Sequence, residues 1–171
     1  PSVINLVLTV VEKKTGQVGF SLSHGSESGW SGGLDYTDNN WKGLGHNFNV
    51  GFETGDNERY WISYSQPFMD EKIYAWKASI YKQFYDDVNY YRKGIKIMEY
   101  DENKKGAYFG FGKKFANNSK FSWFATLEWK DVEVSDKNYQ TGVTSDDLDS
   151  GTTFSIVGTL TWNNIDEYLS Y

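Results

Sequence analysis

The sequence predicts an all-β fold in which antiparallel strands follow one another as a meander. Ribbons of alternating apolar and polar residues recur along the chain, which is the period of a strand with two chemically different faces. Aromatic residues make up 18% of the chain, Gly occurs 17 times and Pro only twice. Such a composition is typical of aromatic-rich strands with Gly at bends, and helix formers such as Ala and Leu are scarce.

The first three strands are expected at residues 17–23, 30–37 and 47–54. A short reversal at residues 25–29 separates the first two. A polar turn with the sequence Asp-Asn-Asn-Trp-Lys-Gly-Leu-Gly, residues 38–45, joins the second and third. The rest of the chain repeats this hairpin unit.

Five further strands are expected at residues 59–66, 73–85, 106–115, 121 to about 135, and 152–162. The segment 86–105 is interpreted as a long polar connection in which Ile95, Ile97 and Tyr100 could extend a strand. Residues 136–150 are interpreted as a second long polar loop. Residues 3–12 form a near-continuous apolar run, which suits a strand buried on both sides in a small α/β domain. We expect a domain boundary at the polar, Gly-containing segment 13–16.

These features indicate an antiparallel transmembrane β-barrel. The connections after the second, fourth and sixth strands are expected to be short and those after the fifth and seventh long, as in barrels with one short-looped rim. Strands of roughly 8 to 14 residues match a tilted membrane crossing of ~9–11. The polar parity holds mostly Gly, Ser, Asn and Thr, whereas the outside of a soluble barrel is usually more charged. A soluble sandwich or lipocalin-like barrel shares the alternation and remains the alternative.

Composition excludes several other classes. The net charge of −6 with scattered basic residues disfavours nucleic-acid binding, and the absence of Cys excludes disulfides and thiol chemistry. No stretch of ~20 apolar residues predicts a spanning helix. The chain starts at Pro1 without an apolar leader, so we expect a fragment whose export signal is removed or lies upstream.

Motifs for catalysis, metals and cofactors are weak, so no enzyme activity, metal or cofactor is expected. His24 and His46, the only histidines, are expected at opposite rims as surface polar residues. The acidic run at residues 146–149 lacks the spacing of a calcium loop, and Gly110-Phe111-Gly112 is no nucleotide fingerprint. Some charged residues occupy strand positions that are expected to face the inside of the barrel. We expect them to be hydrated in a water-filled lumen rather than paired; they are Asp35, Glu53, Lys77, Glu128 and Lys130.

Several motifs together resemble the start of the barrel in the Omp85 superfamily, most of all its outer-membrane assembly factors. They are the Thr-Gly opening at residues 15–16, the reversal at 25–29, the Asp-Asn-x-Trp-x-Gly-x-Gly turn at 38–45, and the turns at 65–68 and 162–166. The apolar run 3–12 resembles the closing strand of the last POTRA domain. The resemblance implies that residues 1–14 end that domain with its linker, and that residues 15–171 are the N-terminal half of a barrel with about twice the strands.

What the resemblance implies about function is the folding and insertion of β-barrel proteins into the bacterial outer membrane, with the POTRA side in the periplasm. The implied partners are nascent outer-membrane β-barrel proteins, accessory assembly lipoproteins and outer-membrane lipid. The first strand would be the lateral gate where a client strand pairs; its residues are Val18, Gly19, Phe20, Ser21, Leu22 and Ser23. The hairpin turn would keep the neighbouring strands in register, through Asp38, Asn40, Trp41, Gly43 and Gly45.

Three rival interpretations stay open. The first is another role within the superfamily: a related assembly factor, a two-partner secretion translocator, or a barrel fused to a passenger enzyme. The second is a small eight-stranded structural or adhesive outer-membrane barrel, since eight strands can close. The third is a soluble β-domain for a small apolar ligand.

Overall fold

A computed structural model gives the fold as one antiparallel sheet of eight strands. It describes residues 14–25, 29–68, 72–116, 120–139 and 149–163. The apolar run 3–12 lies outside the described residues, and so does the first residue of the expected boundary at 13–16. The strands are β1 (Gly16–Gly25), β2 (Gly29–Trp41), β3 (His46–Gly55), β4 (Asn57–Gln66), β5 (Tyr74–Arg92), β6 (Ile95–Lys114), β7 (Phe121–Tyr139) and β8 (Gly151–Trp162).

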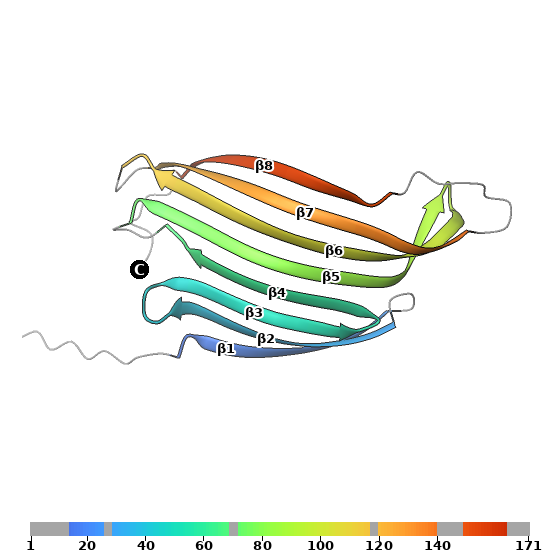
Figure 1. Ribbon diagram of the computed structural model, residues 1–171. Coiled ribbons are helices and arrows are strands. Elements are labelled where there is room, and N and C mark those ends of the chain that lie inside the picture. Colours follow the sequence, from blue (N-terminus) through green and yellow to red (C-terminus); the bar gives the residue numbers. More distant parts are fainter. Residues whose placement is uncertain (1–13, 26–28, 69–71, 117–119, 140–148, 164–171) are drawn as a thin grey trace, which may run out of the picture.

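Each strand pairs with the next one along the chain, so the spatial order is β1 to β8 without a crossover. The all-β antiparallel meander predicted from the sequence is therefore confirmed. Figure 1 shows a curved sheet with β1 and β8 at its two opposite edges. Among the described residues β1 pairs only with β2, and β8 only with β7. The sheet is thus open along both edges.

The two ends of the sheet differ. The end that carries the connections after β2, β4 and β6 is here called the turn rim, and the opposite end, which carries the tip of the β5–β6 hairpin, the hairpin rim. In Figure 1 the turn rim is at the left and the hairpin rim at the right, where β5 and β6 bend away from the rest of the sheet. His24 pairs with Trp30 and His46 with Trp41, at opposite ends of β2, as the sequence predicts.

Two sequence-based expectations are wrong. Strand β7 continues to Tyr139, so residues 136–139 belong to a strand and not to the polar loop expected at 136–150. The segment 86–105 is not a long polar connection, because β5 continues to Arg92, β6 starts at Ile95, and only Lys93 and Gly94 lie between them. Both of these residues have positive φ, 52° and 80°, which is the twist of a tight two-residue hairpin turn. The sequence hid this extension because its side chains do not alternate cleanly. Strands β5, β6 and β7 reach 19, 20 and 19 residues.

Irregular pairing bends the extended hairpin. The register shifts between Tyr85 and Val88, between Tyr90 and Tyr91, and between Glu99 and Asp101. An extra residue in one strand kinks it and increases its twist. Met98, in the bent part, is fully buried at 0% exposure, so the extension has a small packed centre of its own.

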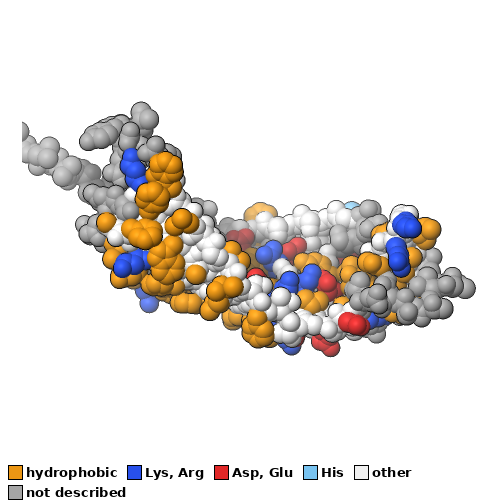
Figure 2. All heavy atoms as spheres, turned by 90° about the horizontal axis from the view of Figure 1, so that it is seen from above, with side chains coloured by type: hydrophobic (Ala, Val, Ile, Leu, Met, Phe, Trp, Pro, Cys, Tyr) orange, Lys and Arg blue, Asp and Glu red, His pale blue; other side chains and the backbone are white. Residues whose placement is uncertain are grey.

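The sheet has two distinct faces. The outer face carries Val18, Phe20 and Leu22 of β1 and the residues of the other strands that lie on the same register lines. The inner face carries Ser21 and Ser23 of β1 and the residues on their register lines. In the space-filling view of Figure 2, hydrophobic side chains gather over the left part, while charged ones cluster toward the middle of the curved surface. No helix long and apolar enough to cross a membrane occurs among the described residues.

Glycines on the inner face make room for aromatic rings on the neighbouring strand. Gly51 stands opposite Trp61, Gly106 opposite Tyr81, and Gly112 opposite Phe124. A Cβ added at Gly106 would lie 2.6 Å from the Tyr81 ring. The ring can therefore lie flat across β6, and its hydroxyl donates a hydrogen bond to Glu128 on β7 at 3.1 Å.

Inner-face charges are held by polar and ring contacts. Glu53 accepts a hydrogen bond from the Ser31 hydroxyl at 2.9 Å. The Lys77 ammonium lies 5.3 Å from the centre of the Tyr108 ring and 5.2 Å from that of Phe124. Within the described part of the chain, no ion pair joins the five inward charges expected from the sequence.

We predict that Gly106→Ala destabilises the sheet, because the new methyl group displaces the Tyr81 ring and weakens its bond to Glu128. Overpacking of this kind costs about 1–3 kcal/mol. The measurement is the free energy of unfolding in detergent. Gly158→Ala is the matched control, since a Cβ at Gly158 meets nothing within 4 Å, and its expected effect is within about 0.5 kcal/mol. Equal losses for the two variants would contradict the prediction.

Candidate functional site

Strand β1 is an exposed edge, as the proposed gate requires. Its outer side chains are among the most exposed apolar groups of the chain, with Val18 at 74%, Phe20 at 86% and Leu22 at 75%. The backbone of β1 pairs with β2 from Gly16–Asp38 to Gly25–Gly29 without a register shift. The alternate backbone groups of β1 therefore face away from the sheet. An edge of this kind is a template for another strand.

From Gly19 onward, the inner face of β1 offers only small side chains. Gly19 lies opposite Asp35, and a Cβ there would be close to the Asp35 carboxylate. The Ser23 hydroxyl lies 2.6 Å from that of Ser31, which donates to Glu53 on β3. This short polar chain links β1 through β2 to β3.

The turn after β2 is built by the side chains that the sequence singled out. Asp38 Oδ1 accepts a hydrogen bond from the Asn40 amide at 2.9 Å, and Asn40 Oδ1 accepts one from the Gly45 amide at 2.6 Å. The backbone adds a bond from the Gly43 amide to the Asn40 carbonyl at 2.8 Å. Gly43 and Gly45 have φ values of 73° and 66°, which Gly adopts at little cost.

Trp41 closes the turn on its outer side. Its ring packs against Phe48 of β3 with 4.6 Å between ring centres, and edge-on against Tyr36 at 6.4 Å. The structure therefore brings Asp38, Asn40, Trp41, Gly43 and Gly45 into one unit. This unit fixes the pairing of β2 with β3.

The turn also holds the beginning of β1. A hydrogen bond from the Thr15 side chain, followed by that from the Asn40 amide, keeps the pKa of the Asp38 carboxyl below its usual value. Gly16 stands opposite Asp38 in the β1–β2 ladder. Asp38 thus links the two sets of residues that the sequence predicted separately, the edge strand and the turn.

The outer face forms an apolar band that runs diagonally across the strands. In the register line through Val18 every residue is apolar: Val18, Tyr36, Val50, Ile62, Ile80, Ala107, Trp129 and Phe154. The next outer-face register line toward the turn rim lies two residues further along each strand. It begins with Gly16 and Asp38 and becomes apolar only from Phe48 of β3 onward. The band therefore begins nearer the turn rim on the later strands.

The opposite border of the band shifts in the same direction. The next outer-face register line from the Val18 line toward the hairpin rim is apolar on β1 to β4 and polar on β5 to β8. Its residues are Phe20, Leu34, Phe52, Tyr60, Lys82, Lys105, Asp131 and Thr152. A band of roughly constant height that moves along successive strands means that the strands are tilted relative to it. Strand tilts of about 35–45° are typical of barrels that cross a membrane.

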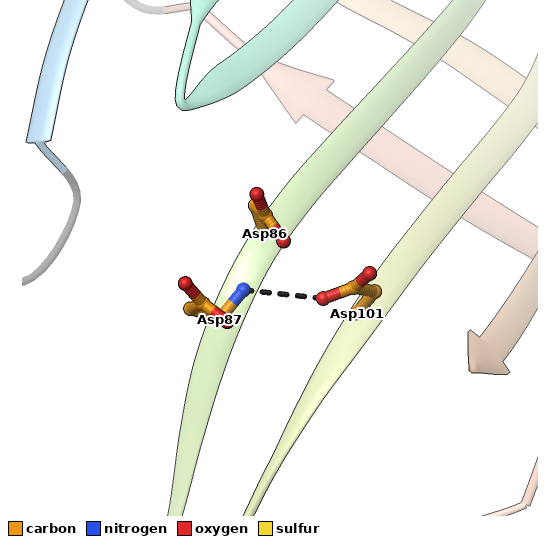
Figure 3. Close-up of side chains that lie close together, drawn as sticks. All are labelled: Asp86, Asp87 and Asp101. Carbon is orange, nitrogen blue, oxygen red and sulfur yellow. Dashed lines mark hydrogen bonds between the residues drawn. The ribbon is translucent and has the colours of Figure 1, made fainter. Parts of the chain in front are cut away.

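Beyond the band, the bent hairpin gathers carboxylates. Asp86 and Asp87 lie at the β5 bulge beside Asp101 of β6, with one oxygen of each within 4.8 Å of the others. Figure 3 shows the three side chains and the bond from the Asp87 amide to Asp101, 3.3 Å long. Oxygen ligands suit a hard divalent cation, but two of the three side chains are exposed.

The neighbouring carboxyls of this cluster shift one another's pKa values. A hydrogen bond with Asp101, burial and repulsion by the neighbouring charges raise the pKa of Asp86. A hydrogen bond with Glu99 and the charge of Glu99 raise the pKa of Asp87. Lys96 pairs with Glu99 and, with Asp87, lowers the pKa of the Glu99 carboxyl. Sequence reasoning missed this cluster because only the β5–β6 register brings residues 86 and 101 together.

The comparisons with known proteins agree with this geometry. A model of the Omp85 superfamily domain matches residues 40–170 of the chain. The crystal structure of BamA from Haemophilus ducreyi lacking POTRA domains 1–3 is similar over 91% of this chain, with 19% sequence identity and a TM-score of 0.52. The chain covers 31% of that BamA chain, so it spans less than a third of its length. A search of curated protein sequences gives no match.

We predict that Gly43→Ala loosens the β2–β3 turn. No atom lies within 4 Å of an added Cβ, so the cost is the left-handed backbone alone, about 1–2 kcal/mol. Unfolding free energy measures the loss. Lys42 already has a positive φ of 56°, so Lys42→Gly serves as the control and is expected to be neutral or stabilising. Tolerance of Gly43→Ala without any loss would contradict the role of the turn.

A second prediction concerns pH. Because the folded hairpin raises the pKa values of Asp86 and Asp87, these two carboxyls bind more protons in the folded than in the unfolded chain, and their contribution to stability falls as the pH rises through the raised values. The lowered pKa of Glu99 acts in the opposite direction. We therefore expect slower amide hydrogen exchange in residues 86–101 near pH 4 than near pH 7, after correction for intrinsic rates. Asp86→Asn should remove much of this difference. Faster amide exchange near pH 4 than near pH 7 would contradict the predicted pH dependence.

Proposed function

Because the chain belongs to the Omp85 superfamily, we propose that it is the first part of the transmembrane barrel of an outer-membrane protein assembly factor like BamA. In this proposal the chain has no bond-making chemistry. It helps to fold and insert nascent β-barrel proteins into the bacterial outer membrane. The observation that carries the proposal is β1, an edge strand with free backbone groups and strongly exposed apolar side chains.

The apolar band supports placement in a bilayer. Side chains such as Phe20, Phe154 and Ile156 are 75% to 86% exposed on the outer face, which is costly in water and favourable against lipid. Polar residues border the band at both ends. The turn rim would face the periplasm, where the POTRA domain ending at residues 1–14 would lie, and the hairpin rim would face outward.

The mechanism follows from backbone hydrogen bonding. In hydrocarbon each unpaired N–H or C=O group costs several kcal/mol, so an incoming strand needs a partner. The free groups of residues 18–23 would provide that partner by β-augmentation. In the complete barrel they would pair with the last strand, and the small inner side chains Gly19, Ser21 and Ser23 would let that seam open. Clients, accessory lipoproteins and lipid would be the partners.

Superfamily membership also fits a translocator, in which the barrel passes a protein across the membrane instead of inserting it. The two roles differ in the fate of the cargo. An assembly factor leaves a protease-protected, membrane-embedded barrel in the vesicle, whereas a translocator leaves soluble cargo on the far side.

We predict that proline in β1 separates pairing with β2 from pairing with a client. Neighbouring residues of a strand point their N–H groups to opposite sides, so of Phe20→Pro and Ser21→Pro one breaks the β1–β2 ladder and the other removes a donor of the free edge. The full-length protein is reconstituted in vesicles, and insertion of an unfolded client barrel is followed. The variant that keeps normal stability should slow insertion about ten-fold or more.

A control and a refutation come from the same pair. The variant that breaks the β1–β2 ladder should have a lower melting temperature. The melting temperatures thus show which of the two N–H groups points toward β2 and which toward the free edge. If the stable variant inserts clients at the normal rate, the edge of β1 is not the working surface.

A further inference from the structure

Two lysines face each other on the outer side of the sheet, at the border of the apolar band. Lys82 of β5 is the direct register partner of Lys105 of β6. Residues that are directly opposite have Cβ atoms about 5 Å apart, and like charges in such pairs are destabilising. Both side chains lie on the same face of the sheet as Ile80, the outer face, where Ile80 is 60% exposed. The pair therefore lies where lipid tails would give way to headgroups.

Only one of the two charges is balanced by the protein. Lys105 lies 3.1 Å from the Asp131 carboxylate, which also accepts a hydrogen bond from the Thr152 hydroxyl at 2.5 Å. Within the described part of the chain Lys82 has no ion pair. Asp131 thus balances only one of the two ammonium groups on this register line, and the next carboxylates of the outer face, Glu58 and Glu133, lie one line further toward the hairpin rim. Screening by water is weaker at such a border than in solution.

An apolar hollow lies next to Lys82. It has a volume of about 750 Å³, and its lining includes Leu34, Phe52, Tyr60, Ile62 and Ile80 as well as Lys82 itself. These apolar side chains belong to β2 to β5 and point outward with the lysine. The surface thus combines a trough for a hydrocarbon chain with a cationic end at the membrane border.

The geometry points to a binding site for an anionic lipid whose phosphate is not neutralised by a cationic group of its own headgroup, in the leaflet on the side of the hairpin rim. One acyl chain lies in the hollow, and the phosphate sits between the ammonium groups of Lys82 and Lys105. Lysine binds phosphate as a flexible point charge, and its long stem can follow the apolar surface while its ammonium group reaches the headgroup. The phosphate removes the repulsion between the two lysines. This inference rests on the proposed placement of the chain in a membrane.

The test uses the full-length protein in phosphatidylcholine vesicles with spin-labelled lipids. The immobilised fraction of labelled phosphatidic acid is compared with that of labelled phosphatidylcholine. We expect a preference for phosphatidic acid of roughly two- to five-fold, since a basic residue near a membrane surface attracts an anionic lipid to that degree. The double variant Lys82→Ser/Lys105→Ser should lose this preference.

The matched control is Lys77→Ser/Lys104→Ser, which removes the same charge from the inner face of the same two strands. It should keep the preference. Lys82→Ser alone leaves the Lys105–Asp131 pair intact and should weaken the preference without unfolding the sheet, as checked by heat-modifiable gel mobility.

Other outcomes overturn the inference. An unchanged preference in the double variant, or an equal loss in the control, means that the lysine pair is not the site. Displacement of the labelled lipid by excess inorganic phosphate means a simple anion site without a role for the acyl chain. Failure of the proposed membrane placement is distinct, because then labelled phosphatidylcholine itself shows no immobilised fraction.

Discussion

Backbone hydrogen bonding is the constraint on which the rest of this structure depends. Each inner strand pairs on both sides, and only β1 and β8 are left with one neighbour among the described residues. Free backbone groups are tolerable in water but not in hydrocarbon. In the proposed membrane placement, the free edges of β1 and β8 would therefore need partner strands. In the proposed function, the free side of β1 is where the strand of a client would pair.

The two faces of the sheet follow from different physical demands. The outer face carries large apolar side chains that the chain itself leaves uncovered, whereas the inner face packs glycines under rings, as at Gly106 and Tyr81. The diagonal course of the apolar band is a property of the register between strands. It gives the tilt of the strands without reference to a membrane, and the Lys82–Lys105 pair marks where the band ends on β5 and β6.

Outside the apolar band, the sheet has the features of a protein in water, with an apolar centre and polar side chains around it. The bent β5–β6 extension contains the buried side chain of Met98. It also carries interacting charged groups: Asp86 forms a hydrogen bond with Asp101, and Lys96 forms an ion pair with Glu99. Polar strands are stable there because water satisfies the outer backbone groups and bulges provide the bend. The Lys82–Lys105 pair lies at the border between the apolar band and this polar extension.

The sequence by itself determined the class of fold, the order of the strands, the polarity of their faces and the turn around Asp38 and Gly43, because period-2 alternation and turn chemistry are local. It failed at residues 86–105, because polar strands beyond the apolar band have no clean alternation to read. Only the tertiary structure decided which distant residues stand opposite each other, such as Lys82 and Lys105 or Asp86 and Asp101. That depends on register and bulges, which are set by the pairing of whole strands and not by any one segment.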